Sequence, residues 1–336
     1  MATTTSIADG AWVTGAKWDT GNVPTALDDT IVAHALTDTA GTLACLDLTI
    51  NVGKGLVGDT TTQLKVWGDA VIDGTLDLPF VGELEFLGFL TAGATANFIV
   101  PGAGLGMLSI AGSAHTITCN GVRLPNLIIE PAVAGATYTL TDDLFCGTLK
   151  LTTGTGVGVL ICGTNDIDCT GIEMLDLGDV TGSGAINVAG DIEFLVGGWS
   201  HTGTLTMTAS GNLAAAAACA LPVLTIDAGV TASVTGDSTI TAITNNGVIC
   251  IAATKTLTGT LAFGAGSFNN SGILDGASGA STNTSAVVIG GTVNNVDLTG
   301  QTALLHLYPA AASAGGNVNV TELSPLIQHV LGLAPV

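Results

Sequence analysis

Short stretches in which apolar and polar residues alternate recur along nearly the whole chain, and each ends at Gly, Asn or Asp. Examples are Leu43–Ile50, Thr137–Leu140 and Thr204–Thr208. Alternation with a period of two over four to eight residues is typical of a β-strand with one buried face. Because no amphipathic helix is evident before residue 320, the sequence predicts an all-β protein built from many short strands.

Asn pairs near the C-terminal end recur at a spacing typical of stacked repeat units. The first Asn of each pair is Asn245, Asn269 or Asn294, which gives a spacing of about 24 residues. Three short strands and three turns fill roughly 20 to 25 residues, which is one rung of a solenoid. A propeller blade needs about 40 residues and an immunoglobulin-like domain about 100. We therefore predict a right-handed parallel β-helix in which these three Asn residues stack as a ladder at equivalent turns.

Composition excludes several other classes of protein. Hydrophobic residues make up 47% of the chain, which argues against disorder, and six Lys and Arg are too few for long amphipathic helices. The formal charge of −21 and the scattered basic residues argue against binding to nucleic acid or to an acidic membrane surface. Acidic residues are spread along the sequence, so we interpret them as solubilising charges.

The N-terminal segment carries a motif that resembles a known group of proteins. Its residues are Gly10-Ala-Trp12, Trp18-Asp-Thr-Gly21, Val23-Pro24, Asp28-Asp29 and Ile31. They resemble a Trp-x-x-Gly-x-Val-Pro-x-x-x-Asp-Asp motif of β-helical bacterial surface adhesins and phage fibre or decoration proteins. The body resembles the same group at Leu124–Leu127, Thr139–Leu144, Gly147–Gly154 and Ile186–Ile192. Members without a signal peptide resemble virion components, whereas exported members resemble adhesins.

Residues 1–30 have a mechanical interpretation as an N-terminal cap. The first rung of a solenoid has no neighbour to cover its apolar end. Trp12 and Trp18 are large enough to fill that end, while Pro24, Asp28 and Asp29 would turn the chain into its first strand. A Trp-based sugar-binding surface is the alternative, and we favour the cap. The repeat body is predicted over residues 31–308.

Residues 309–336 are predicted to be a linker followed by a short C-terminal helix. Pro325 suits the first turn of a helix. One apolar stripe follows, formed by Leu323, Leu326, Ile327, Val330 and Leu331. The helix would either cap the last rung or dock on another subunit.

Residues that could carry chemistry are present but do not form a recognisable catalytic pattern. Glycoside hydrolysis needs two carboxylates at a defined separation, and the candidate pairs are Asp142 with Asp143, Asp166 with Asp168, and Glu173 with Asp176. Calcium at the Asn165–Asp168 turn is an open alternative without a complete ligand loop. The seven Cys form no C-x-x-C pair, and the five His are far apart. We predict no catalytic residue, no metal ligand and no cofactor.

These expectations together favour a virion structural protein: a head-decoration, fibre or tailspike-like part. Residues 1–10 contain no recognisable secretory signal, so we expect assembly in the host cytoplasm and a location in the virion. The predicted partners are further copies, as a homotrimer, other virion proteins and host-surface glycans. The alternatives are a bacterial surface adhesin at the cell surface and a polysaccharide-degrading enzyme.

Overall fold

The fold is described from a computed structural model. The stretches of residues that the structure describes are mostly long up to residue 263 and three or four residues long beyond it. They are residues 2–38, 41–59, 62–77, 83–99, 107–112, 114–131, 133–152, 157–175, 178–195, 198–216, 219, 221–252, 255–263, 267–270, 273–275, 287–289, 292–294, 305–307 and 313–315.

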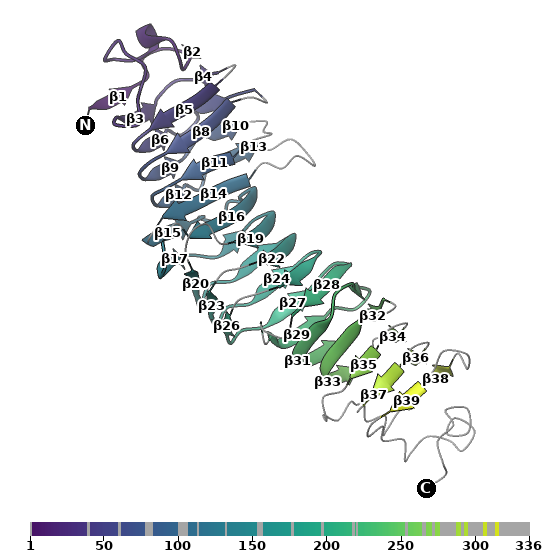
Figure 1. Cartoon of the computed structure of the whole chain (residues 1–336). Coiled ribbons are helices and arrows are strands. Elements are labelled where there is room, and N and C mark those ends of the chain that lie inside the picture. Colours follow the sequence, from purple (N-terminus) through teal and green to yellow (C-terminus); the bar gives the residue numbers. More distant parts are fainter. Residues whose placement is uncertain are drawn as a thin grey trace, which may run out of the picture. The chain divides into compact units, whose positions relative to one another are not determined.

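The protein is an all-β parallel solenoid, as the sequence predicts. Neighbouring strands in its sheets are far apart in the chain, and they pair in parallel (Figure 1). The right-handed sense of winding stays a prediction. The chain divides into two compact units, which the sequence did not predict. Unit 1 comprises Met1–Cys169 with Asp176–Gly184, and unit 2 comprises Thr170–Leu175 with Ala185–Val336.

Unit 1 is built from three sheets, and consecutive strands of the chain pass from one sheet to the next. Sheet 1 holds β1 (Thr3–Thr5), β3 (Asp29–Val32), β6 (Leu48–Ile50), β9 (Ala70–Ile72), β12 (Leu90–Ala92), β15 (Ala114–Thr118), β17 (Ala136–Leu140), β20 (Gly158–Gly163) and β23 (Asp179–Gly182). Sheet 2 holds β5 (Gly41–Cys45), β8 (Thr62–Val66), β11 (Glu83–Phe86), β14 (Met107–Gly112), β16 (Asn126–Pro131) and β19 (Thr148–Leu151). Sheet 3 holds β2 (Gly10–Ala11), β4 (Leu36–Thr37), β7 (Gly55–Val57), β10 (Thr75–Asp77) and β13 (Asn97–Ile99). The pair β18 (Leu144–Phe145) and β21 (Ile167–Cys169) and the short 3₁₀ helix η1 (Gly15–Lys17) complete the unit.

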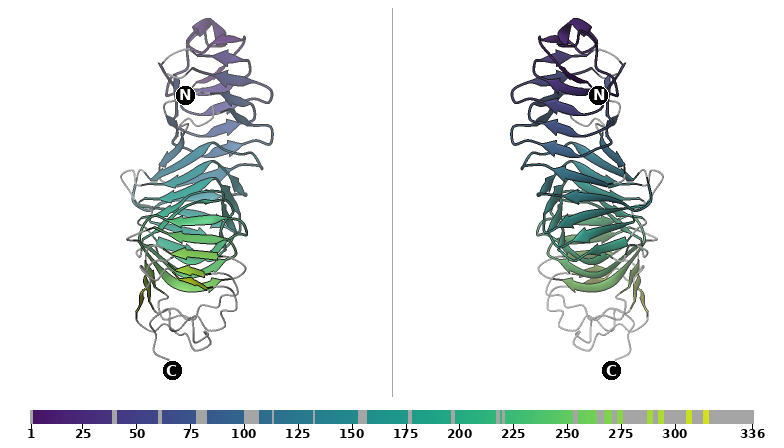
Figure 2. Two further views of the ribbon diagram at one scale, coloured as in Figure 1. Left: turned by 90° about the vertical axis from the view of Figure 1, so that its right-hand side faces the viewer. Right: turned by 90° about the vertical axis from the view of Figure 1, so that its left-hand side faces the viewer.

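Unit 2 repeats the same principle with two sheets. Sheet 4 holds β22 (Gly171–Met174), β25 (Ile192–Phe194), β28 (Gly211–Ala215), β30 (Thr231–Val234), β32 (Val248–Ile251), β34 (Ser267–Asn270), β36 (Val287–Ile289) and β38 (Leu305–Leu307). Sheet 5 holds β24 (Ile186–Val188), β27 (Leu205–Met207), β29 (Leu221–Ile226), β31 (Ser238–Asn245), β33 (Thr256–Phe263), β35 (Ile273–Asp275), β37 (Thr292–Asn294) and β39 (Ser313–Gly315). Strand β26 (Gly198–His201) belongs to the same unit. The two views of Figure 2 show the strands of each unit stacked one above the next.

Alternation along each strand places apolar side chains inside the solenoid. In sheet 1, Val32, Ile50, Ile72 and Ala92 are paired from rung to rung, and all four are fully buried. Their polar neighbours point outward because successive side chains of a strand leave on opposite faces. Aliphatic rows of this kind form a continuous core that needs no layer of helices to cover it.

Rung length changes between the units, and this corrects the predicted Asn ladder. In unit 1, Leu48 pairs with Ala70 of the next rung. In unit 2, Leu205 pairs with Leu224, and Leu224 pairs in turn with Ile243, so each of these rungs is shorter than the one in unit 1. The Asn spacing in the sequence is longer than either rung. It therefore does not correspond to one rung in this part of the chain.

The ladder of Asn245, Asn269 and Asn294 was wrong in its register. Asn245 belongs to β31 and pairs with Phe263, whereas Asn269 belongs to β34 and pairs with Cys250. Asn294 belongs to β37 and pairs with Asp275. Asn245 is fully buried and accepts a hydrogen bond from the Gly247 amide at 3.1 Å, so it stabilises its own turn. Asn269 lies in a strand of a different sheet from Asn245 and Asn294, so the repeated Asn pairs do not mark equivalent positions of successive rungs.

The predicted C-terminal helix lies outside the described residues. This applies to Leu323, Leu326, Ile327, Val330 and Leu331, and both interpretations of that segment stay predictions.

Candidate functional surfaces

Acidic side chains at the turns of unit 1 bind the main chain of the next rung. An Asp47 Oδ1 oxygen accepts a hydrogen bond from the Asp69 amide at 2.8 Å, and Asp69 Oδ1 accepts one from the Phe89 amide at 2.9 Å. These amides stand at the ends of strands, where some N–H groups find no carbonyl partner in the neighbouring strand. The carboxylates therefore act as structural acceptors that tie successive turns together.

The same bond recurs around both units, always between residues about one rung apart. The pairs are Asp9 with Ala35 N at 2.9 Å, Asp143 with Asp166 N at 2.9 Å, Asp191 with Asn212 N at 2.7 Å, and Asp237 with Thr256 N at 3.0 Å. Asn126 and Ser210 accept the amides of Thr148 and Thr231 in the same way. This use of Asp gives the acidic excess of the sequence a structural cause beyond solubility.

Of the carboxylate pairs that the sequence singled out, Asp142 and Asp143 both bind main-chain amides of a neighbouring rung. Asp142 accepts the Cys119 and Asn120 amides, whereas Asp143 accepts the Asp166 amide. The two neighbouring carboxylates thus bind main chain in two different rungs. Asp168 lies in β21 and Glu173 in β22, where Glu173 pairs with Glu193, while Asp176 lies outside the described residues.

The Asn165–Asp168 turn also uses its polar groups for the scaffold. Asn165 Nδ2 donates to the Leu140 carbonyl at 2.8 Å, and the Asp166 amide donates to Asp143. Within the part of the chain that the structure describes, no three His, Cys, Asp or Glu side chains are grouped to hold a metal ion.

Six of the seven cysteines are buried free thiols, and Cys250 is half-buried. Burial raises the pKa of Cys45, Cys119 and Cys162 to about 12, and it also raises the pKa of Cys146 well above its ordinary value. A thiol reacts as a nucleophile through its thiolate. These four side chains therefore behave as small hydrophobic core residues.

Two buried histidines have unpartnered ring nitrogens. His115 lies between Phe89 and Tyr138, and neither of its ring nitrogens has a hydrogen-bond partner. His201 accepts from the Gly203 amide at 3.2 Å through Nδ1, and its Nε2 has no partner. Burial lowers the pKa of both imidazoles, so both favour the neutral form.

Of the residues predicted for the N-terminal cap, Trp12 and Trp18 contact each other. Trp12 and Trp18 are buried with their rings edge to face at 5.0 Å, and Trp18 Nε1 donates to the Trp12 carbonyl at 2.8 Å. Pro24 is buried, and Asp28 accepts hydrogen bonds from the amide and hydroxyl of Thr25.

Asp29 begins β3, and its amide donates to the Ala2 carbonyl. Its side-chain Oδ1 is buried with no hydrogen-bond partner. The burial of both indoles leaves little ring surface for a sugar, and the capping role itself stays a prediction.

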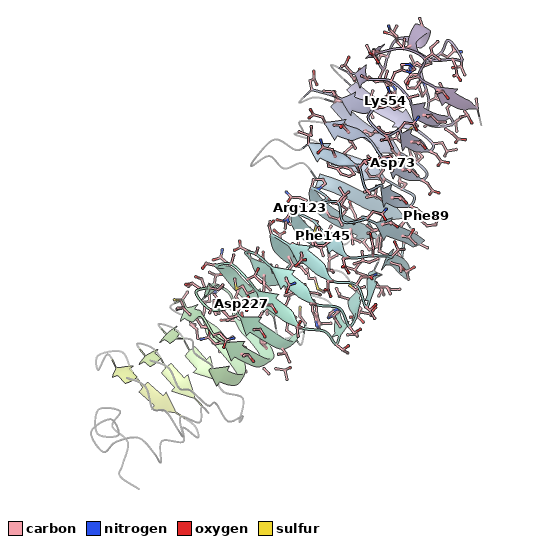
Figure 3. The ribbon with its side chains drawn as sticks, turned by 180° about the vertical axis from the view of Figure 1, so that it is seen from behind. Lys54, Asp73, Phe89, Arg123, Phe145 and Asp227 are labelled. Atoms are coloured by element: carbon pink, nitrogen blue, oxygen red, sulfur yellow. The ribbon has the colours of Figure 1, made fainter. Side chains whose placement is uncertain are left out.

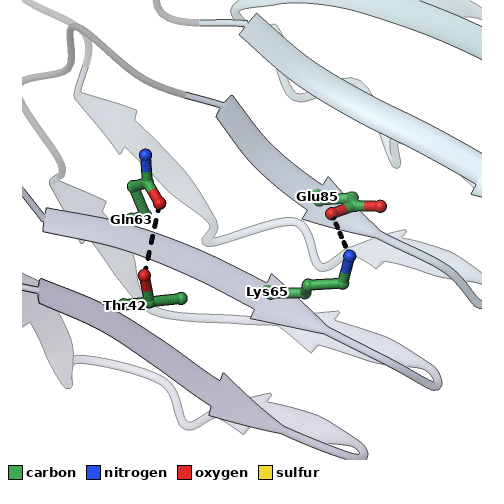
Figure 4. A network of polar contacts seen from close by, with 4 residues as sticks. All are labelled: Thr42, Gln63, Lys65 and Glu85. Atoms are coloured by element: carbon green, nitrogen blue, oxygen red, sulfur yellow. Dashed lines mark hydrogen bonds and ion pairs between the residues drawn. The ribbon is translucent and has the colours of Figure 1, made fainter.

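A polar patch lies on the outward face of sheet 2 (Figure 4). Lys65 in β8 forms an ion pair with Glu85 in β11 at 2.5 Å, and Thr42 in β5 donates to Gln63 in β8 at 3.2 Å. Next to them, the Lys65 ammonium lies 4.5 Å from the ring centre of Trp67, which is 49% exposed. We call Thr42, Gln63, Lys65, Trp67 and Glu85 the tryptophan patch. It presents an aromatic ring beside amide, ammonium and carboxylate groups.

The basic side chain of Arg123 binds the main chain in another part of unit 1. Arg123 and Phe145 form a parallel bridge and lie side by side (Figure 3), and Arg123 Nη2 donates to the Cys146 carbonyl at 2.8 Å.

Sheet 1 presents a third kind of surface, formed by uncharged side chains. Outward positions in β6 to β20 are filled by Thr, Val, Ile and Ala. They are Thr49, Val71, Thr91, Ala114, Thr116, Thr118, Thr137, Thr139, Val159 and Ile161. We call this set the uncharged face.

No family model, curated protein or solved structure matches this chain. Function is therefore inferred from the surfaces that the fold builds. Among the described residues, no helix has the length and apolar character that a membrane crossing requires.

The rung-to-rung role of Asp was missed in the sequence, although a signal for it exists. Asp47 and Asp69 each stand directly before the first apolar residue of a strand, and they are separated by one rung length. The tryptophan patch was missed as well. Gln63, Lys65 and Trp67 are two residues apart in β8 and directly after it. Thr42 in β5 pairs with Gln63, and Glu85 in β11 pairs with Lys65, so the patch is recognisable only once the strand pairing is known.

Proposed function

We propose that this chain is a structural protein of a particle surface, as a head-decoration, fibre or tailspike-like part of a virion. The observation that carries this proposal is the bonding of acidic turn residues to the main chain of the next rung. A scaffold that uses its carboxylates in this way suits a part that has to stay folded outside a particle. The resemblance of residues 10–31 to phage fibre and decoration proteins supports the virion over other particles.

Immunogold electron microscopy tests the location. Antibodies raised against the recombinant chain are applied to virus particles and to cells from the source of the sequence. We expect gold on the particles. Gold confined to cell surfaces would transfer the proposal to an adhesin, and gold on neither would overturn it.

An enzymatic role is tested separately. Asp142 and Asp143 bind main chain in different rungs, so they are poorly placed to act as an acid and a nucleophile on one glycosidic bond. We expect no release of reducing ends or unsaturated sugars from a broad panel of polysaccharides. Release that disappears in the Asp143→Asn variant would contradict the structural proposal.

A glycan-binding adhesin is the second candidate, and the tryptophan patch favours it. Aromatic rings offer a broad contact surface to the C–H face of a sugar, and the neighbouring Gln63 and Glu85 are hydrogen-bonding groups. The formal charge of −21 disfavours acidic sugars, so a neutral glycan fits best.

Trp67→Ala is the variant that tests this second candidate. Phe89→Ala is its matched control, because Phe89 is also an exposed aromatic residue of unit 1, at 44%. Binding of neutral oligosaccharides is followed by tryptophan fluorescence and by calorimetry. If this role is correct, wild type and Phe89→Ala bind alike and Trp67→Ala loses at least tenfold in affinity. No binding by wild type removes the candidate.

A further inference from the structure

Two buried thiols of unit 1 lie next to each other on neighbouring rungs. The parallel pairing of β18 with β21 places Phe145 opposite Asp168. Cys146 and Cys169 are the next residues of the two rungs, and the Cys146 amide donates to the Asp168 carbonyl at 3.0 Å, which continues the same register. Both side chains are inside the solenoid, at 0% and 2% exposure. The fold therefore brings together two thiols that are one rung apart in the chain.

The charges around Cys146 agree with this placement. Burial raises the pKa of the Cys146 thiol, and the thiols of Cys169 and Cys119 raise it further, so the three lie close together. Arg123 acts in the opposite direction. Its Nη2 atom donates to the Cys146 carbonyl at 2.8 Å, so a guanidinium group stands beside the thiols. The Cys119 thiol is itself hydrogen-bonded to the main chain of Phe145, which leaves Cys146 and Cys169 as the pair.

The spacing of this pair suits a metal ion held in line between two sulfurs. Neighbouring strands lie about 4.8 Å apart, and two metal–sulfur bonds of about 2.3 Å in line span about 4.6 Å. A disulfide brings its two Cβ atoms to about 3.8 Å, which is closer than the strand spacing. Among the residues that the structure describes, no third His, Cys, Asp or Glu joins such a group. A soft cation that accepts two thiolate ligands, as Cu(I) does, fits this arrangement.

Binding would exchange protons for the ion without any oxidation or reduction. One Cu(I) ion displaces a proton from each thiol, forms two sulfur–copper bonds and leaves a complex with one negative charge. A negative charge in an apolar core needs a positive partner, and Arg123 stands beside Cys146 to provide it. A divalent ion with the same two ligands, such as Hg(II), would give a neutral complex instead. The two ions should therefore differ in how strongly they depend on Arg123.

We propose that Cys146 and Cys169 bind one Cu(I) ion in line between their sulfurs, with Arg123 neutralising the complex. No metal ligand was predicted from the sequence, because the cysteines show no C-x-x-C spacing and only strand register brings these two together. The ion would join neighbouring rungs inside unit 1. This site goes beyond the proposed particle-surface function and does not depend on it.

Anaerobic titration of the reduced full chain with Cu(I), in the presence of a competing chelator, tests the site. Because both thiols are buried, the ion is added to the folded protein and also during refolding from urea. We expect one retained ion per chain, with sulfur-to-metal charge-transfer absorption in the ultraviolet. Because two protons leave per ion, the apparent Kd should rise about a hundredfold for each unit by which the pH falls. A tenfold rise would indicate a single thiol and contradict the paired site.

Cys146→Ala and Cys169→Ala should each weaken Cu(I) binding by about a hundredfold or more. Cys45→Ala is the matched control, because Cys45 is also fully buried in unit 1 but pairs with Val66 rather than with a thiol. If one of the two site variants does not fold, the other carries the test. Equal binding by Cys45→Ala and a folded site variant overturns the proposal. So does an absence of a retained ion in wild type, or a Cys146–Cys169 disulfide in the isolated protein.

Arg123→Gln tests the charge. It should weaken binding of Cu(I) by about tenfold or more and leave binding of Hg(II) nearly unchanged, because only the copper complex is charged. A merely structural effect of losing the bond to the Cys146 carbonyl would weaken both ions alike. Equal losses for the two ions would therefore overturn the assigned role of Arg123.

Discussion

At the scale of single residues, the main finding is that a turn Asp is a structural part of this protein. Asp69 shows both halves of the arrangement, since its amide donates to Asp47 and its carboxylate accepts from Phe89. Hydrogen bonds with a charged partner are stronger than neutral ones, although exposure to water reduces what they contribute. Many such bonds, each of modest strength, connect the turns of neighbouring rungs.

Replacing Asp69 tests this role. Asp69→Ala removes the acceptor of the Phe89 amide and should lower the free energy of unfolding by about 1–2 kcal/mol. Asp69→Asn keeps a side-chain carbonyl oxygen at the same place, so its loss should be less than half as large. Urea midpoints of the three proteins give the comparison. Equal losses in both variants would show that the charge, rather than the bond, stabilises the turn.

The two buried histidines predict how stability depends on pH. Burial lowers the folded-state pKa of His115 and His201 below the unfolded value of about 6.5. The unfolded chain then binds more protons, so stability is fully present above pH 6.5 and declines as the pH falls below it. His115→Phe fits between Phe89 and Tyr138 and cannot take up a proton. Its urea midpoint should fall less between pH 7 and pH 5 than that of wild type, and an unchanged fall would contradict this explanation.

At the scale of elements, close stacking of rungs requires glycine at defined turns. A Cβ on Gly74 would lie 2.3 Å from the Lys54 carbonyl oxygen and 2.5 Å from that of Asn51, both main-chain atoms of the preceding rung. Gly55, in β7, would place its Cβ at an ordinary 3.5 Å from Thr75. The turn before β10 can therefore keep its distance to the rung below only with glycine at position 74.

The matched variants are Gly74→Ala and Gly55→Ala. Main-chain atoms cannot rotate away as a flexible side chain does, so Gly74→Ala should destabilise the protein by roughly 1–3 kcal/mol. Gly55→Ala should change the free energy of unfolding by less than about 0.5 kcal/mol. Thermal unfolding followed by circular dichroism distinguishes them. Similar melting temperatures for the two variants would mean that the rungs lie further apart than the structure has them.

The N-terminal cap makes its own prediction at this scale. Trp18→Phe keeps a ring against Trp12 but loses the bond to the Trp12 carbonyl, which should cost about 1–3 kcal/mol. Trp18→Ala also opens a cavity and should cost about 3–5 kcal/mol. Scanning calorimetry measures both. A melting temperature that Trp18→Ala leaves unchanged would rule out a capping role for this residue.

The alternation of apolar and polar residues made the fold predictable from the sequence, whereas the rung length and the strand register were not predictable. Leu43–Cys45 and Thr137–Leu140 show their strand character in sequence, because burial follows each second residue. The shorter rungs of unit 2 include β31 and β33, which are eight residues long each. Local alternation of apolar and polar residues does not show how far a strand continues, so the length of these rungs was not predictable. For the same reason, an Asp at a turn looks alike in sequence whether it binds its own loop or the next rung.

At the scale of the whole molecule, the surfaces assigned in unit 1 and the structural role of Asp depend on one claim, which is that neighbouring rungs are stacked in parallel with the register described above. The register of unit 2 differs most from the Asn spacing in sequence, so it offers the sharpest test. Thr206 and Thr244 occupy one outward row of sheet 5, two rungs apart, whereas Ser233 lies on sheet 4.

Spin labels at paired positions measure this register most directly. Cysteines are introduced as Thr206→Cys with Thr244→Cys, or as Thr206→Cys with Ser233→Cys, in a Cys250→Ala background that removes the half-buried native thiol. Two rungs at about 4.8 Å predict a backbone separation of roughly 10 Å for positions 206 and 244, within reach of dipolar broadening. Labels at positions 206 and 233 leave different sheets and should lie about 20 Å apart or more. The opposite order, with 206 and 233 close and 206 and 244 distant, would contradict the stacked register.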